Sequence, residues 1–140
     1  MSQPVCELND GVKERIKQFR FSNNKCTAAV ILKVDTNTLK VIIDTEYEDC
    51  TMDEIQEELP VSQPRFIVLS YVYHHDDGRV SYPLIFIFVS PQGCKPEQQM
   101  LYAGSVRALT KELEMTKVFD VRSTDEFTVE WIEEKLKHTA

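Results

Sequence analysis

Apolar residues recur along the chain with two different periods, and the change of period shows where strands give way to helices. Runs rich in β-branched and aromatic residues predict strands over 28–34, 39–44, 65–73, 80–90 and 118–122. A spacing of three to four residues predicts helices over 10–20, 94–114 and 128–137, and Thr51 followed by Glu54 fits the capping box of a short helix that ends before Pro60. This order of elements predicts an α/β fold of the α+β type, with a central mixed β-sheet sandwiched between helices.

The first and last helices each offer one apolar face to this sheet. Asp10 is a suitable N-cap for the first helix, and we expect the basic side of that helix to face solvent. The residues expected to be buried are Val12, Ile16 and Phe19 in the first helix, and Val129, Trp131, Ile132 and Leu136 in the last.

The strands at 65–73 and 80–90 are expected to form a hairpin. Asp77-Gly78 predicts its turn, because glycine accepts a positive φ. The second strand is apolar throughout Leu84 to Val89, so we expect helices on both faces of the sheet. Pro83 has no N–H to donate, which predicts an edge position or a bulge near it.

The stretch from Cys94 to Glu114 predicts one long helix, with Pro96 and Glu97 suited to its first turn. An ordinary core stripe is formed on one face by Leu101, Tyr102, Ser105, Ala108, Leu109 and Leu113. The opposite face carries Met100, Ala103, Gly104, Arg107, Lys111 and Glu114, so its first half is apolar where a solvated face would be polar.

Gly104 needs a compensating contact, because glycine costs roughly 1 kcal/mol relative to alanine inside a helix. Small residues let another backbone approach closely, and methionine packs adaptably against irregular surfaces. Either this outer face enters a groove on a partner protein or a second layer of the same domain covers it. The pattern leaves both readings open.

Charge restricts the classes of partner. The 16 basic and 23 acidic residues give a net charge of −7, which repels nucleic-acid phosphates and anionic lipid. We therefore expect no nucleic-acid partner and no membrane partner. The 140 residues, 42% of them hydrophobic, predict a single monomeric domain over 1–140 whose first several residues are flexible. The N-terminal ten residues have no apolar segment typical of a secretory signal.

The residues that carry chemistry form no recognisable catalytic or metal-binding pattern. The four cysteines include no CxxC pair, which favours reduced thiols over zinc ligation. The segment from His74 to Asp77 resembles a metal site most closely, but consecutive residues of an extended segment point to opposite sides. We expect no metal, no cofactor and no enzymatic activity.

Three stretches of the chain are similar to the glia maturation factors. They are 63–68 (QPRFIV), 75–84 (HDDGRVSYPL) and 93–105, which contains GCKPEQQM and YAGS. Trp131 in the last helix fits as well, so the resemblance runs from the first helix to the end. That family has the actin-depolymerising-factor homology (ADF-H) fold of cofilin, which agrees with the predicted order of elements.

The resemblance implies a cytoplasmic regulator of branched actin, located at the cell cortex and leading edge. Such proteins bind the actin-related-protein (Arp) branching complex, inhibit nucleation and promote debranching. The residues implied to enter the barbed-end cleft of an actin-related subunit are Lys95, Gln99, Met100, Ala103, Gly104, Arg107 and Lys111. A second contact, with an adjacent actin or complex subunit, is implied for His75, Asp76, Asp77 and Arg79, unless these form a solvated turn.

The chain departs from the cofilin pattern just before Met100. Cofilin-like proteins carry lysines there, whereas this chain has Gln98 and Gln99, so we expect little binding to conventional actin. Two alternatives stay open: an intracellular signalling or growth-factor-like modulator of kinases, and a cofilin-like protein that binds and severs actin. Ser2 is a candidate modification site, where phosphorylation would add negative charge.

Overall fold

The computed structural model of the chain describes residues 6–20 and 25–139. The strands are β1 (Glu7–Leu8), β2 (Ala28–Asp35), β3 (Lys40–Tyr47), β4 (Arg65–Ser70), β5 (Tyr73–His74), β6 (Val80–Ser81), β7 (Leu84–Val89) and β8 (Lys117–Val121). The helices are α1 (Asp10–Arg20), α2 (Met52–Glu58), α3 (Pro96–Glu112) and α4 (Val129–Thr139), with a 3-10 turn at Thr124–Glu126. Every helix and strand predicted from the sequence is present.

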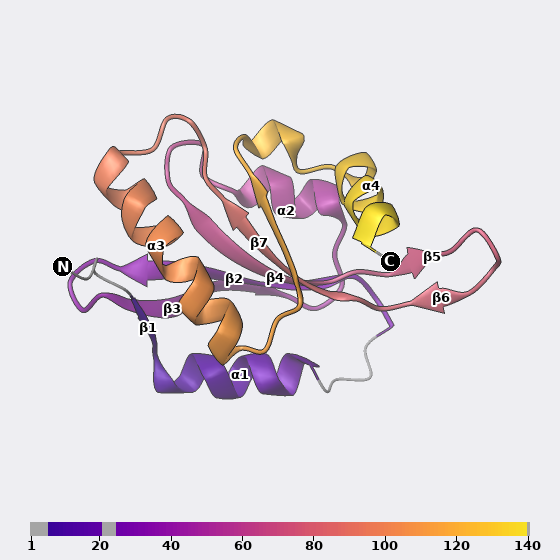
Figure 1. The fold of residues 1–140 in the computed structure, drawn as a ribbon, viewed down its shortest axis with the longest axis horizontal. Helices are drawn as coiled ribbons and strands as arrows, with labels where there is room; N and C mark the ends of the chain where they lie inside the picture. The colour runs from indigo at the N-terminus through magenta and orange to yellow at the C-terminus, as the bar shows by residue number, and fades with distance from the viewer. Residues whose placement is uncertain (1–5, 21–24, 140) are drawn as a thin grey trace.

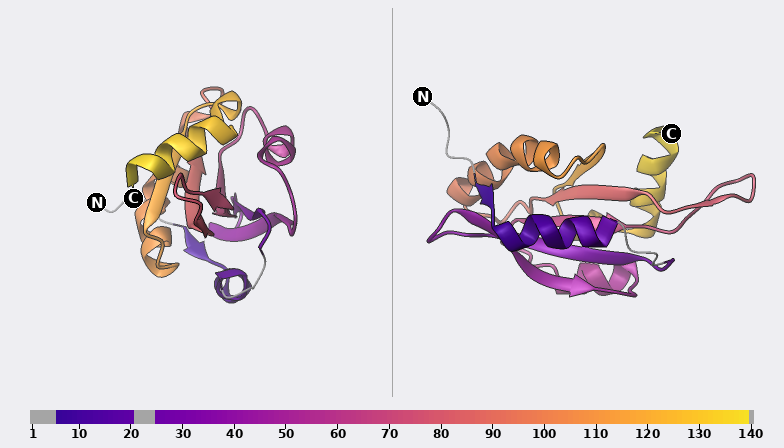
Figure 2. Two further views of the ribbon diagram at one scale, coloured as in Figure 1. Left: turned by 90° about the vertical axis from the view of Figure 1, so that its right-hand side faces the viewer. Right: turned by 90° about the horizontal axis from the view of Figure 1, so that it is seen from below.

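A twisted six-stranded sheet in the order β1-β3-β2-β4-β7-β8 forms the centre of the fold (Figure 1). The four inner strands pair antiparallel, whereas β1 and β8 add to the edges in parallel. Helices α1 and α3 cover one face, and α2 and α4 cover the other (Figure 2). The predicted mixed sheet between helices is therefore confirmed.

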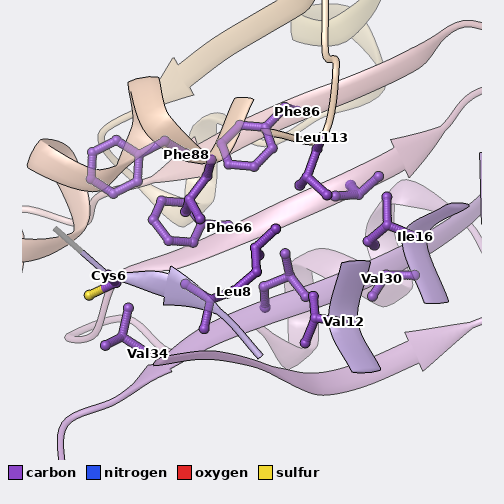
Figure 3. Packing of buried hydrophobic residues seen from close by; sticks show 14 of the residues in the cluster. Cys6, Leu8, Val12, Ile16, Val30, Val34, Phe66, Phe86, Phe88 and Leu113 are labelled. Atoms are coloured by element: carbon purple, nitrogen blue, oxygen red, sulfur yellow. The ribbon is translucent and has the colours of Figure 1, made fainter. Parts of the chain in front are cut away.

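Two apolar cores lie on the two faces of this sheet. The core under α1 and α3 is built around Phe66, which lies close to Phe86 and Phe88 (Figure 3). The Phe66 ring centroid lies 5.4 Å from that of Phe86 and 5.1 Å from that of Tyr102. The core under α2 and α4 takes the alternate residues of the same strands, such as Ile67 and Ile87. Each side chain from Ile85 to Val89 is buried, as its unbroken apolar run predicts.

The long hairpin predicted over 65–73 and 80–90 is interrupted near Pro83. The proline splits its strand into β6 and β7, and its carbonyl accepts a hydrogen bond from the Tyr71 backbone at 3.1 Å. Strands β5 and β6 consequently form a separate two-stranded ribbon that projects beyond the main sheet (Figure 1). Gly78 occupies its turn with φ of 92°, the conformation for which glycine was predicted there.

Several local predictions are wrong. Helix α1 already includes Asp10, so the residue before the helix is Asn9, whose carboxamide oxygen accepts the Gly11 N–H at 3.2 Å. Val129 is 40% exposed at the start of α4 and does not join the core. The two-residue strand β1 was missed, because so short a segment has no period to read.

The basic side of α1 is not simply solvated. Arg15 pairs with Glu46 of β3 at 2.6 Å, and Lys13 lies 3.7 Å from Glu112 of α3. Arg20 donates to backbone carbonyls just beyond the end of α3. Contacts with other elements therefore occupy much of the face that the sequence assigned to solvent.

Candidate interaction surfaces on helix α3 and the β5–β6 hairpin

The inner face of α3 is held to the sheet by directed hydrogen bonds as well as by apolar packing. Ser105 is fully buried, and its hydroxyl accepts the Cys6 N–H at 2.9 Å while donating to the Leu101 carbonyl at 2.8 Å. The Tyr102 hydroxyl, also buried, accepts the Val34 N–H at 2.8 Å. These bonds connect α3 to the N-terminal segment and to β2.

Both ends of α3 are anchored in the same way. Near its start the Gln99 side-chain amide donates to the Ser90 hydroxyl at 2.9 Å. At its end the Arg20 guanidinium donates to the Leu113 carbonyl and, at 3.2 Å, to the Glu114 carbonyl. The positive charge of Arg20 also interacts favourably with the negative C-terminal end of the helix dipole. The helix is thus fixed in position and in rotation about its axis.

The outer face of α3 is accessible from solvent. Met100 is 62% exposed, Ala103 is exposed and Gly104 is half-buried. Among the described residues no second layer covers Met100, which removes the alternative that this face is internal. Ala108, assigned to the core stripe from the sequence, is exposed instead, so the inner stripe is narrower than predicted.

Basic residues flank this apolar patch. Lys95 precedes the first turn, and Arg107 and Lys111 follow one and two turns beyond Ala103; all three are exposed. A basic rim on a chain with a net charge of −7 favours an acidic partner surface at this face. The residues of α3 that were predicted to contact a partner thus share one accessible surface. Gln99 is the exception, because its side-chain amide donates to Ser90.

The tip of the β5–β6 hairpin is a compact polar turn. The Asp77 carboxylate accepts the Arg79 backbone N–H at 3.1 Å and its Nε–H at 2.7 Å. The pKa of Asp77 is lowered, chiefly by that backbone N–H and also by the guanidinium. Asp76, Asp77 and Arg79 are exposed, so three of the four predicted hairpin residues face solvent.

His75 belongs to the stem of the hairpin. Its Nε2 lies 2.8 Å from the Ser81 hydroxyl, and its ring meets the Tyr73 ring edge-on at 4.7 Å between centroids. The residue is half-buried, so it shapes the ribbon that carries the tip. The hairpin and the start of α3 lie at opposite ends of the molecule, so the structure brings the predicted site residues together as two separate surfaces (Figure 1).

The described residues hold no group of three or more histidine, cysteine or acidic side chains that could bind a metal ion. In the described part of the chain, none of the helices has the length and apolar character needed to span a bilayer. Ser2 lies outside the described residues. The anchors Ser90 and Arg20 were missed from the sequence, and no local pattern signals them, because each acts on a residue distant along the chain.

Comparison with known proteins shows the fold family to which the chain belongs. A family model described as cofilin/tropomyosin-type actin-binding protein matches residues 5–137. The crystal structure of Streptomyces griseoflavus cofilin superposes with a TM-score of 0.80 at 21% identity, covering 95% of this chain and 98% of that one, which shows a shared fold. The chain is thus an ADF-H protein of the cofilin type, and its function lies in regulation of the actin cytoskeleton.

More similar relatives show which family of ADF-H proteins the chain belongs to. Human glia maturation factor beta is 53% identical over 132 residues, which are 94% of this chain and 93% of that protein. Glia maturation factor of Drosophila melanogaster is 44% identical over 95% of this chain and 96% of its own length. The solution structure of glia maturation factor from Caenorhabditis elegans has a TM-score of 0.83 at 42% identity, covering 96% of this chain and 98% of that one. The chain belongs to the glia maturation factor family.

Proposed function

We propose that this protein binds the Arp branching complex through the outer face of α3, inhibits branched nucleation and promotes debranching. The observation that carries the proposal is the 62% exposure of Met100 on a helix whose opposite face is hydrogen-bonded into the fold. The helix backbone that carries Met100 is already fixed, so docking orders only the methionine side chain, which adapts its shape to the partner surface. The partner surface is the barbed-end cleft of an actin-related subunit.

The patch divides into parts with different roles. Met100, with the small residues Ala103 and Gly104 beside it, supplies apolar contact and close backbone approach. Lys95, Arg107 and Lys111 orient the helix on an acidic surface and accelerate encounter. These exposed charges add little to affinity by themselves, because solvent screens them.

No bond is made or broken by the protein in this proposal. It acts by binding more tightly to a conformation of the complex that cannot hold a daughter filament, and so shifts the population towards that conformation. A differential affinity of roughly 3 kcal/mol changes the occupancy of branches about a hundredfold. The place of action is cytoplasmic, at cortical and leading-edge branched actin.

Discrimination against conventional actin follows from Gln98 and Gln99. A neutral pair at this position lacks the attraction that cofilin-like proteins obtain from lysines, so affinity for acidic actin is low. Since Gln99 donates to Ser90, Gln98 is the neutral residue of the pair that meets a partner most directly. The hairpin tip is a second and weaker contact, in which Asp76 and Arg79 meet a neighbouring actin or complex subunit.

A paired binding experiment tests the proposal. Purified protein is offered filamentous actin in a co-sedimentation assay and the Arp branching complex in a pull-down, both at physiological salt. Wild type is expected to bind the complex, and Met100→Asp to lose that binding with its circular dichroism spectrum unchanged. Val129→Asp, a like change at an exposed apolar residue of α4, is the control and keeps binding.

Each outcome has a distinct meaning. Binding mainly to actin would make the protein cofilin-like and refute the role given to the glutamines. Binding to neither target would refute the proposed function as a whole. If Met100→Asp and Val129→Asp lost equal affinity for the complex, the assignment of the binding site to the outer face of α3 would be wrong.

A further inference from the structure

Leu39, at the end of the β2–β3 turn, has a backbone conformation that disfavours leucine. Its φ is +56°, and the left-handed region is accessible without penalty only to glycine and, with little penalty, to asparagine and aspartate. The turn itself imposes that conformation: the Leu39 N–H donates to the Asp35 carbonyl at 2.7 Å, and the Asn37 N–H donates to the Asp35 carboxylate at 2.9 Å. Backbone geometry therefore favours glycine or asparagine at position 39.

Packing does not explain this leucine either. Its side chain is 42% exposed, and it belongs to neither of the two apolar cores. A bulky apolar residue that is both strained and exposed indicates a requirement outside the folded domain.

The β2–β3 turn lies beside the first half of α3. Val34, next to the turn, donates to Tyr102 of α3 at 2.8 Å. Thr36 in the turn and Gln98 in α3 line one polar hollow of about 400 Å³. Two views show the turn and the start of α3 at the same end of the molecule (Figures 1 and 2).

The size of protein interfaces indicates what covers this turn. A stable interface takes roughly 20–30 residues from each side. Helix α3 has 17 residues, and the side chains of Tyr102, Ser105 and Leu109 are buried beneath it. A partner seated on its outer face must therefore also cover neighbouring elements, and the β2–β3 turn adjoins the half of α3 that carries Met100.

We propose that Leu39 is a second apolar anchor for the protein partner that binds α3, and that it inserts into an apolar depression on that partner. This inference rests on the proposed function, since the partner is the actin-related subunit of the Arp branching complex. The exposed polar residues of the turn, Thr36 to Thr38, surround the anchor and meet the partner's polar rim.

The test uses a substitution that improves the fold while removing the anchor. Leu39→Asn accepts the left-handed conformation, so its urea midpoint is expected to rise, whereas its affinity for the purified Arp branching complex falls at least tenfold. Leu39→Gly is the second variant, with the same expected loss of affinity. Glu114→Asn is the matched control, because Glu114 has the same φ of +56° beyond the far end of α3. Its urea midpoint is expected to rise with unchanged affinity.

The outcomes separate this inference from the proposed function. If both Leu39 variants bind the complex as tightly as wild type, Leu39 is not an anchor, and the proposed role of the outer face of α3 is unaffected. If the Leu39 variants unfold at lower urea than wild type, the leucine is structural and the inference is wrong. If wild type does not bind the complex, both the proposed function and the proposed role of Leu39 are refuted.

Discussion

Ser105→Ala offers a quantitative test of how α3 is held against the sheet. The Ser105 hydroxyl accepts the Cys6 N–H at 2.9 Å, and both residues are buried, with exposures of 0% and 1%. Alanine removes the acceptor, and the space left by one hydroxyl is too small for a water molecule to replace it. The Cys6 N–H is then buried without a partner.

The expected loss can be estimated from these contacts. A buried donor left without an acceptor costs about 1–3 kcal/mol. Alanine exceeds serine in helix propensity by roughly 0.5 kcal/mol, which offsets part of that loss. The free energy of unfolding should therefore fall by about 0.5–2.5 kcal/mol. For a chain of this length, each kcal/mol lowers the melting temperature by about 4 °C.

Urea unfolding and amide hydrogen exchange measure the two parts of this prediction. The Cys6 amide is expected to exchange much faster in Ser105→Ala, because the N-terminal segment loses its bond to α3. Thr110→Ala is the control on the same helix, since the Thr110 hydroxyl only donates back to the Arg107 carbonyl at 3.1 Å. That control should be neutral or slightly stabilising. Unchanged protection of Cys6 together with unchanged stability would refute the reasoning.

Three further predictions concern other polar and titratable groups. Tyr71→Phe removes the hydrogen bond that the Tyr71 hydroxyl donates to Glu133 at 2.8 Å, so unfolding free energy at pH 7 should fall by about 1 kcal/mol. Burial first, and then Glu133, raises the pKa of Tyr71 above its usual 10. The stability that the Tyr71 hydroxyl contributes is therefore complete below pH 10 and is lost as the pH rises further. Above pH 10, urea titrations should show wild type losing stability relative to Tyr71→Phe. Arg20→Ala leaves the Leu113 carbonyl without its charged donor and should cost about 1–2 kcal/mol, with faster exchange in the last turn of α3. Burial, assisted by nearby carboxylates, raises the pKa of Cys50 to about 11, so its alkylation by iodoacetamide at pH 8 should be far slower than that of an unfolded control, as followed by mass spectrometry.

Features encoded by neighbouring residues could be predicted from the sequence. The long helix was placed at Cys94–Glu114 and observed at Pro96–Glu112, because proline and a sustained period of 3.6 residues are local signals. The Thr51 hydroxyl accepts the Glu54 N–H at 3.1 Å, as the capping box predicts. The same period placed Met100 opposite the core stripe but left open whether a second layer covered it, and its 62% exposure in the structure decides that question.

Features that join distant residues could not be predicted. Cys6 and Ser105 are 99 positions apart, and no local period encodes their hydrogen bond. The sequence also assigned Gln99 to the partner, whereas its amide is engaged by Ser90. A glutamine beside an exposed methionine looks identical in sequence whether it faces a partner or a neighbouring loop, and only the fold decides between them.

These distant bonds determine which face of α3 a partner meets. Apolar burial is non-directional, so a stripe such as Tyr102 and Leu109 tolerates some rotation of the helix about its axis. Hydrogen bonds require alignment, and those of Gln99, Tyr102 and Ser105 act on successive turns of α3. Rotation by one residue would break all three and would turn Met100 by 100°. The apolar stripe turns Met100 outward, and these polar contacts fix the rotation of the helix at that position. Substitutions beneath the helix should therefore change partner binding even though they touch no partner.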